Sequence, residues 1–262
     1  MRPKQLRIST VSYINAKPFV YGIEHSGFLS RLGEDPSSGG IDYSLSLDIP
    51  SVCAAKLKRN EVDIGLAPVA VIPELKEHFI IPDFCIGSSG AVLTVMLYSD
   101  VPLKEIKTVF LDYQSKTSSM LVQILAKKFW KISPAFVQAE EGYEKKISQA
   151  TAGLIIGDRN FSLPNKFKYA YDLSAEWQLF TGLPFVFACW ISNIRLEKSV
   201  SIAFHEALKY GVENKEAVVE ALKGQYDEKV TRNYLNNAIS YSFDKQKQTA
   251  MDLFLDLGKE IV

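Results

Sequence analysis

The feature that most restricts the possible folds is a repeated alternation of strand and helix patterns in the first third of the sequence. Apolar and polar residues alternate over residues 6–11 and again over residues 41–47, which is the period of a β-strand, and residues 62–67 form a short apolar run. Helix patterns begin at Pro18 and Pro50, where the missing N–H of proline costs nothing in the first turn. The order β-α-β-α-β predicts a sheet covered by helices, as in doubly wound α/β folds.

The same alternation starts again in the middle of the chain. Its strand and helix patterns lie, in order, at residues 109–111, 118–130, 135–137, 143–150 and 153–156. Ser174 is the expected N-cap of a further helix. Residues 183–191 form a long apolar run, which we interpret as a buried strand that crosses between lobes. From Glu197 onward the pattern is helical.

Two such units predict an α/β fold with two lobes, each a mixed, mostly parallel sheet flanked by helices. We expect residues 1–92 and 190–262 to form the first lobe together with the C-terminal helices. Residues 93–189 would form a second, inserted lobe. A ligand would bind in the cleft between the lobes, where concave sites form. The Gly- and Ser-rich tract at residues 33–40, GEDPSSGG, predicts a surface loop.

Composition excludes several classes of function. The formal net charge of zero argues against a broad footprint for nucleic acid or for an anionic membrane. Cys53, Cys85 and Cys189 are far apart and form no CxxC, so we expect buried core thiols and neither disulfides nor a zinc site. The three histidines share no ligand spacing, and we predict no metal site. No secretory or membrane-spanning apolar segment is present, so we expect a cytoplasmic protein.

The first candidate site follows the first predicted strand, where Ser12, Tyr13 and Asn15 come before Pro18. Ligands of open α/β sheets bind at the carboxyl ends of the strands. Asn15 offers one amide acceptor and two donors and cannot titrate. It could also serve only as the N-cap of the following helix, and the sequence leaves both interpretations open.

Three further polar turns follow predicted strands. Ser88, Ser89 and Gly90 form a turn whose glycine allows the backbone to approach a ligand and whose hydroxyls supply donors. Ser115, Thr117 and Ser118 lie at the start of an amphipathic helix, which is either an anion site or a simple cap. Gly157 and Asp158 follow a strand, and Asp158 could face the cleft or cap the next segment.

The sequence contains no Ser-His-Asp arrangement, no P-loop, no GxGxxG and no HExxH. The residues alone therefore predict a two-lobed α/β protein that binds a small anion through hydroxyls, amides and helix N-termini.

Six segments together resemble the chorismate dehydratase family of the futalosine route to menaquinone. They are VSYINAKP, DIGLAPV, IGSSGAV, DYQSKTSSMLVQIL, LIIGD and EWQLFTGLPFVFACW, and they occur in the order of that family. The resemblance implies a type II periplasmic-binding-protein-like fold. It also implies a cytoplasmic enzyme without cofactor that removes water from chorismate to give 3-[(1-carboxyvinyl)oxy]benzoate.

The resemblance further assigns the site. Asn15 and Ser88 match catalytic positions, and Ser115, Thr117 and Ser118 match a start of a helix that would bind a carboxylate. The other expected substrate-binding residues are Ser12, Tyr13, Ser89, Gly90, Gly157 and Asp158. Ser89 stands where relatives often carry Asp or Asn. A substrate carboxylate, an ordered water and Asp158 are all open as the proton acceptor, because an amide cannot act as a base.

Chorismate is the expected partner, with no nucleic acid and no membrane, and the expected state is a monomer or homodimer. Two alternatives are 1,4-dihydroxy-6-naphthoate synthase of the same pathway, which shares the fold, and a solute-binding protein for a small carboxylate. VSYINAKP and FTGLPFVFACW favour the dehydratase over the synthase.

Overall fold

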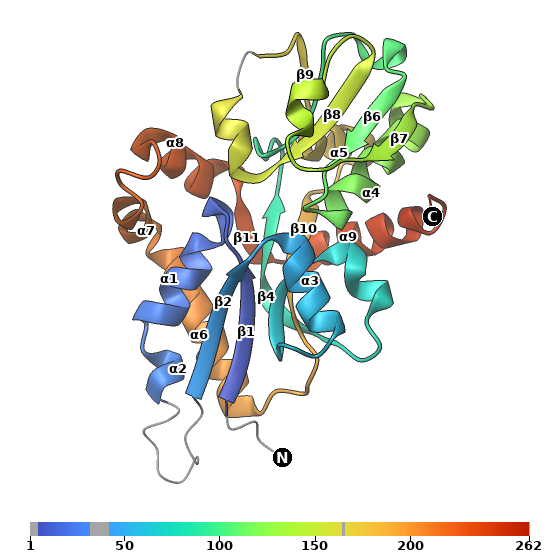
Figure 1. The fold of residues 1–262 in the computed structure, drawn as a ribbon. Coiled ribbons are helices and arrows are strands. Elements are labelled where there is room, and N and C mark those ends of the chain that lie inside the picture. The colour runs from blue at the N-terminus through green and yellow to red at the C-terminus, as the bar shows by residue number, and fades with distance from the viewer. Residues whose placement is uncertain (1–4, 32–41, 164–165, 262) are drawn as a thin grey trace.

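The computed structural model describes residues 5–31, 42–163 and 166–261, and the loop predicted at residues 33–40 lies outside the described residues. The described chain forms two sheets, one above the other in Figure 1. The larger, lower sheet has six strands, in the spatial order β11 (Ser240–Phe243), β4 (Phe79–Ser88), β10 (Phe185–Ser192), β3 (Ile64–Pro68), β1 (Gln5–Val11) and β2 (Asp42–Asp48).

The six-stranded sheet is mixed. The first strand, β1, pairs in parallel with both β2 and β3, which the alternation of strand and helix patterns predicted. The strand β10 runs antiparallel to both of its neighbours, β3 and β4, and β11 runs antiparallel to β4. Most of the strands therefore point the same way, with β10 and β11 reversed.

The upper sheet has five strands, in the spatial order β7 (Ala135–Gln138), β6 (Thr108–Leu111), β8 (Thr151–Ile156), β5 (Val95–Ser99) and β9 (Tyr169–Asp172). It is also mixed, because β6 pairs in parallel with β7 and β8, while β5 is antiparallel to β8 and β9. Two mixed sheets flanked by helices confirm the predicted fold class.

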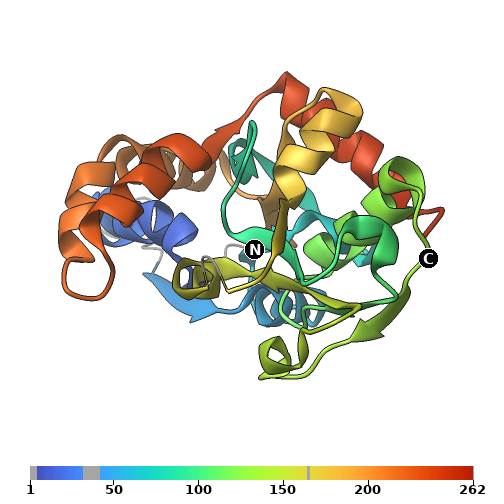
Figure 2. The same cartoon turned by 90° about the horizontal axis from the view of Figure 1, so that it is seen from above.

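Helices cover both sheets (Figure 1). The α-helices are α1 (Lys17–His25), α2 (Phe28–Arg31), α3 (Pro50–Lys58), α4 (Lys116–Ile124), α5 (Leu173–Thr181), α6 (Lys198–Glu213), α7 (Lys215–Ala221), α8 (Glu228–Asn233) and α9 (Lys245–Gly258). Short 3-10 turns at Ile14–Ala16, Val69–Glu74, Leu103–Glu105, Tyr143–Lys146 and Gly157–Ser162, and π-helical segments at Leu125–Trp130 and Tyr234–Ala238, complete the described helical structure. Seen from above, the blue α1 and the orange to red α6–α8 gather at one end of the molecule (Figure 2).

Three local expectations change in the structure. The strand β10, expected to cross between the lobes, pairs with β3 and β4 and lies within the six-stranded sheet. The exact residue ranges expected for the two lobes are a separate point and stay a prediction. Asp172, and not Ser174, caps α5, because its Oδ1 accepts hydrogen bonds from the N–H groups of Ser174 and Ala175. The helix expected at residues 143–150 is a 3-10 turn of four residues.

We call the six-stranded sheet with the helices that cover it the lower lobe, and the five-stranded sheet with its helices the upper lobe. The core of the lower lobe is built around β10, all eight of whose residues are buried. Its Trp190 packs edge-on against Phe19 of α1, with ring centroids 5.6 Å apart, and against Phe204 of α6 at 5.0 Å. All three cysteines are free and buried, as predicted for small core residues.

Two glycines bring α1 and α6 into backbone contact. A Cβ atom on Gly211 of α6 would lie 1.8 Å from the carbonyl oxygen of Pro18, and one on Gly22 of α1 would lie 1.9 Å from the carbonyl oxygen of Ala207. Side-chain atoms cannot approach backbone this closely, so glycine at both positions sets the separation of the helices. Because α1 directly follows the turn that carries Asn15, this contact also fixes where that turn lies.

We expect Gly211→Ala to destabilise the protein, although alanine favours a helix over glycine by about 1 kcal/mol. The added methyl group must push α1 and α6 apart, and such overpacking costs about 1–3 kcal/mol. Urea denaturation of the variant beside Lys209→Ala, an exposed change in the same helix, measures the effect. A Gly211→Ala protein more stable than the wild type would contradict the close contact of the two helices.

Candidate active site

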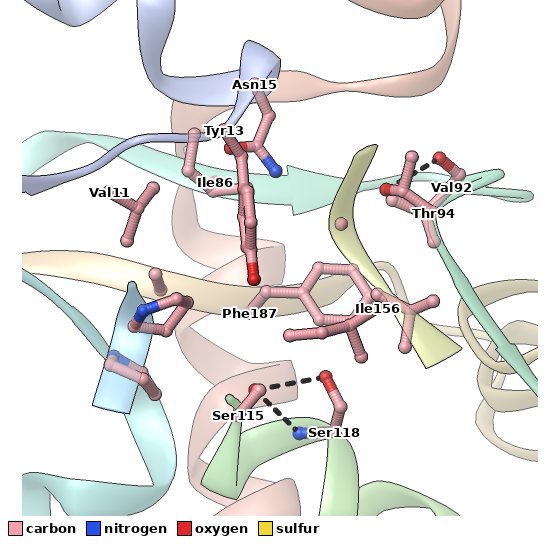
Figure 3. A pocket seen from close by; sticks show the side chains of 15 residues that line it. Val11, Tyr13, Asn15, Ile86, Val92, Thr94, Ser115, Ser118, Ile156 and Phe187 are labelled. Atoms are coloured by element: carbon pink, nitrogen blue, oxygen red, sulfur yellow. Dashed lines mark hydrogen bonds between the residues drawn. The ribbon is translucent and has the colours of Figure 1, made fainter. Parts of the chain in front are cut away.

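A pocket lies between the two sheets, and Figure 3 shows it from close by. The lower lobe supplies Val11, Tyr13, Asn15, Pro50, Pro68, Ile86, Phe187 and Ala188, and the connection between the sheets supplies Val92 and Thr94. The upper lobe supplies Val95, Ser115, Ser118, Ile156 and Gly157. Among the described residues that line the pocket, none is Asp, Glu, Lys, Arg or His.

Tyr13 crosses the pocket from the lower lobe to the upper one (Figure 3). Its hydroxyl donates to Oε1 of Gln114, in the loop before α4. Burial raises the pKa of the Tyr13 phenol, and the nearby Asp112 raises it further, so the hydroxyl stays protonated at neutral pH. The ring packs against Gly157, where a Cβ would lie 2.7 Å from the Tyr13 Cζ and where φ is +71°. Glycine is therefore required at 157 by space and by backbone conformation alike.

Asn15 lies in the 3-10 turn Ile14–Ala16 and points down into the pocket (Figure 3). It does not cap α1, whose N-cap is Ala16 without a side-chain hydrogen bond, so the interpretation of Asn15 as a cap was wrong. Its Nδ2 donates to the hydroxyl of Tyr234 at 3.3 Å. Its Oδ1 is buried and has no partner among the described residues.

Ser115 and Ser118 face Asn15 from the other side of the pocket, at the start of α4 (Figure 3). Ser115 is the N-cap, as one of the two interpretations predicted, because its Oγ accepts from the Ser118 N–H at 3.2 Å. The Ser118 hydroxyl also donates to the Ser115 Oγ at 3.1 Å. The first N–H groups of a helix have no partner within the helix and attract anions.

Thr117 has a different role from its two neighbours. Its side chain is fully buried, and its Oγ1 accepts a hydrogen bond from the N–H of Ala70, which lies in the lower lobe. It does not line the pocket with Ser115 and Ser118. In this structure Thr117 therefore joins the two lobes.

The turn after β4 is also placed outside the lining of the pocket. The hydroxyl of Ser88 is buried and donates to the carbonyl oxygen of Gly90 at 3.0 Å. Ser12, Ser89 and Gly90 do not line the pocket either. The structure thus brings together Tyr13, Asn15, Ser115, Ser118 and Gly157 of the expected residues. The catalytic and substrate-binding roles expected for these and for all the other site residues stay predictions.

Asp158 connects the lobes. It does not line the pocket, and it is not the N-cap of its own 3-10 turn, which is Ile156. Its carboxylate accepts from the N–H of Ile14, with distances of 3.2 and 3.1 Å to the two oxygens. The Tyr226 hydroxyl donates to it at 3.5 Å. Burial raises the pKa of the Asp158 carboxyl to about 6, although the Ile14 N–H, Lys17 and Tyr226 each lower it in part.

Sequence reasoning missed Asp112, which orders the loops of the upper lobe. Its buried carboxylate accepts from the N–H of Gln114 at 2.9 Å, from the N–H of Ile156 at 3.1 Å, and from Arg159. Burial raises the pKa of the Asp112 carboxyl, whereas Arg159 and these hydrogen bonds lower it. The only sequence signal was its place at the end of a predicted strand, just before Ser115.

Thr94 and Tyr234 were also missed, and nothing in the local pattern singles them out. Their hydroxyls lie 2.7 Å apart, with Thr94 in the pocket lining and Tyr234 directly behind Asn15. The pair is separated by 140 positions in the chain. Only the tertiary fold brings them to Asn15.

Comparison with known sequences shows the family of this chain. The sequence pattern of the menaquinone biosynthesis family matches residues 6–260, nearly the whole chain. This protein is a member of the menaquinone biosynthesis family. A chorismate dehydratase of Thermus thermophilus is 31% identical over an alignment of 181 positions, and the match covers 61% of this chain and 66% of the length of that relative.

Solved structures agree with the fold of this menaquinone biosynthesis protein. A structure from Archaeoglobus fulgidus has a TM-score of 0.73 at 14% identity and covers 99% of this chain and 98% of its own. The alkanesulfonate-binding protein SsuA from Xanthomonas axonopodis pv. citri, bound to MOPS, has a TM-score of 0.62 at 14% identity and covers 100% and 96%. Together with the two mixed sheets, these matches show the type II periplasmic-binding-protein fold.

The described part of this menaquinone biosynthesis protein holds neither a cluster of metal ligands nor a membrane-spanning helix. No group of three or more His, Cys, Asp or Glu side chains in it is placed to hold a metal ion. In the same residues, no helix has the length and apolar character needed to cross a membrane.

Asp158 gives this family member a testable dependence of stability on pH. Its folded-state pKa of about 6 lies above the usual 3.8, so the folded protein binds the proton more tightly than the unfolded chain does. The contribution of Asp158 to stability is thus largest at acid pH and is lost as pH rises through about 6.

We therefore expect Asp158→Asn, which keeps an acceptor without the charge, to gain stability relative to the wild type as pH rises. The gain between pH values of about 4 and about 7 should be about 1–3 kcal/mol. Urea denaturation at both pH values measures it, with the exposed Asp252→Asn as control. A stability difference that does not change with pH would refute the burial of an ionisable Asp158.

Proposed function

We propose that this protein is a chorismate dehydratase, which removes water from chorismate to give 3-[(1-carboxyvinyl)oxy]benzoate. The observation that carries the proposal is the composition of the pocket between the lobes, in a member of the menaquinone biosynthesis family. The similarity to the Thermus thermophilus enzyme supports the same activity. The proposal includes the expected cytoplasmic location and a monomeric or homodimeric state.

The pocket suits a small ring that carries carboxylates. Val11, Ile86 and Phe187 supply apolar walls for the ring. Asn15 on one side and the start of α4 on the other supply uncharged hydrogen-bond donors. The walls would position the ring while the donors bind its carboxylates and its hydroxyl.

The reaction itself needs little acid–base machinery from the protein. The proton on ring C3 is acidic because the neighbouring double bond conjugates that carbon to the C1 carboxylate. Its removal gives a dienolate, whose electrons expel the C4 hydroxyl, and that group leaves as water after taking up a proton. The ring becomes aromatic, which drives the reaction. Donors that are already in place can stabilise the charge that develops.

In this proposal, Asp158 is the least favoured of the three candidate proton acceptors. The carboxylate of Asp158 is bound to the Ile14 N–H and does not line the pocket. We therefore favour a carboxylate of the substrate or an ordered water over Asp158 as the acceptor.

Purified protein incubated with chorismate tests the proposal, with the aromatic product followed by chromatography and NMR. We expect conversion to 3-[(1-carboxyvinyl)oxy]benzoate without any added cofactor. Conversion of a later intermediate to 1,4-dihydroxy-6-naphthoate, with chorismate untouched, would identify the sister enzyme instead. Tight binding of chorismate without turnover would identify a solute-binding protein.

Asn15→Ala should keep the fold and lower kcat by about a hundredfold or more, because removing one well-placed donor typically costs that much. The assay is the conversion of saturating chorismate, with circular dichroism as a check of folding. Asn237→Ala, an exposed change of the same residue type, serves as control. Turnover near the wild-type value in Asn15→Ala would show that the amide has no part in the reaction.

Ser118→Ala should raise KM about tenfold or more and change kcat less, since a carboxylate ligand acts in the ground state and the transition state alike. A hydrogen bond to a charged group contributes about 1.5–3 kcal/mol. Lys116→Met is the matched control, because Lys116 pairs with Glu74 and lies outside the pocket lining. A large loss of binding in Lys116→Met, with normal KM in Ser118→Ala, would refute the assignment of the carboxylate to the start of α4.

A further inference from the structure

Three side chains form a chain of hydrogen bonds behind the pocket. The Asn15 Nδ2 donates to the Tyr234 hydroxyl at 3.3 Å, and the Tyr234 and Thr94 hydroxyls lie 2.7 Å apart. The Thr94 Oγ1 also lies 3.5 Å from the carbonyl oxygen of Val92, the contact drawn in Figure 3. These groups come from the turn after β1, from the connection between the sheets and from the C-terminal π-helical segment.

The direction of each hydrogen bond follows from what each group can do. A carbonyl oxygen only accepts, so the Thr94 hydroxyl is the donor in its 3.5 Å contact with Val92. Either hydroxyl can donate in the 2.7 Å bond between Thr94 and Tyr234, and the contact with Val92 favours Tyr234 as the donor. The Tyr234 oxygen in turn accepts from Asn15. The side-chain amide of Asn15 ends in a nitrogen and an oxygen. The series of hydrogen bonds places its nitrogen, and not its oxygen, against the Tyr234 hydroxyl.

Tyr234 is well suited to fix an orientation. Its side chain has no exposed surface, and its ring packs edge-on against Phe161, with centroids 5.1 Å apart. Burial raises the pKa of the phenol, so the hydroxyl keeps its proton at neutral pH. Tyr234 does not line the pocket, and any effect on a ligand must therefore pass through Asn15 or Thr94.

We propose that Tyr234, together with Thr94, is a positioning residue that holds the Asn15 amide as a hydrogen-bond donor to the substrate. This inference rests on the proposed function. One N–H of Nδ2 is bound to Tyr234, and the second N–H is left for the ligand.

The orientation matters because the substrate is rich in acceptors. Both carboxylates and the leaving C4 hydroxyl of chorismate present oxygen lone pairs. A turned amide would direct its Oδ1 toward these oxygens and repel them. Without the Thr94 oxygen, the Tyr234 proton would be free to bind the Asn15 Oδ1, which has no partner among the described residues, and the amide would turn.

Steady-state kinetics with chorismate test the proposal in two variants. Tyr234→Phe and Thr94→Val should each lower kcat about tenfold or more while KM stays within about twofold, because a misplaced group near the reacting atoms can cost up to about a hundredfold in rate. Thr94→Ser keeps the hydroxyl and should restore kcat to within about threefold of the wild type. A purely structural role would instead change kcat and KM together, without rescue by serine.

Tyr241→Phe is the matched control for loss of a buried phenol. Tyr241 is also buried, and its hydroxyl donates to the backbone carbonyl oxygen of Asn15 at 2.9 Å, so it does not contact the amide. This variant should lose stability without the fall in kcat seen for Tyr234→Phe. Equal losses of kcat in the two phenylalanine variants would overturn the proposal.

NMR of the side-chain amide separates this inference from the proposed function. In protein labelled with ¹⁵N-asparagine, Asn15→Ala identifies the amide signal, and exchange of its protons with water is measured without any ligand. Exchange should accelerate about tenfold or more in Tyr234→Phe and Thr94→Val, even if the wild type does not convert chorismate. Unchanged exchange in both variants would show that Tyr234 does not hold the amide, whatever the activity of the protein.

Discussion

Contact between the two lobes is the interaction on which the candidate site depends. The turn after β1 belongs to the lower lobe, yet its Ile14 N–H binds the Asp158 carboxylate and its Tyr13 hydroxyl binds Gln114, both in the upper lobe. The Ala70 N–H, also from the lower lobe, binds Thr117. Each bond joins the lower lobe to the upper lobe, through a loop, a 3-10 turn or the start of α4. The pocket exists only while these segments face each other.

The pocket can bind a charged ligand, although none of its described lining residues is charged. Its described lining residues include neither cations nor carboxylates, while the half-buried Arg159 pairs with the buried Asp112 outside the lining. A dianion in such a pocket would be stabilised by the N-terminus of α4 and by neutral donors. Binding it in this way avoids the desolvation of a Lys or Arg side chain. This design suits a reaction whose driving force lies in the substrate and whose transition state mainly needs oriented donors.

Local sequence predicted the fold and the places of the polar turns. Alternating apolar residues gave the strands, and Pro18 and Pro50 gave two helix starts, because these signals act within a few residues. Ser115 was open to prediction as a cap for the same reason. The role of Tyr234 and the binding of Asp158 to Ile14 could not be predicted in this way. The Asn15–Tyr234 bond spans 219 positions in the sequence, and the Ile14–Asp158 bonds span 144. The exclusion of Thr117 from the pocket likewise depends on a tertiary partner, Ala70, whereas the Ser88 hydroxyl bonds within its own turn, to Gly90.

The central claim is that the ligand lies between Asn15 and the start of α4, enclosed by both lobes. A crystal structure with 3-[(1-carboxyvinyl)oxy]benzoate bound tests it most directly. The account predicts one carboxylate within hydrogen-bond distance of the Ser115 and Ser118 hydroxyls, and the Asn15 amide nitrogen against another oxygen of the ligand. A ligand bound outside this pocket, or bound with its carboxylates against Lys or Arg side chains and away from α4, would contradict it.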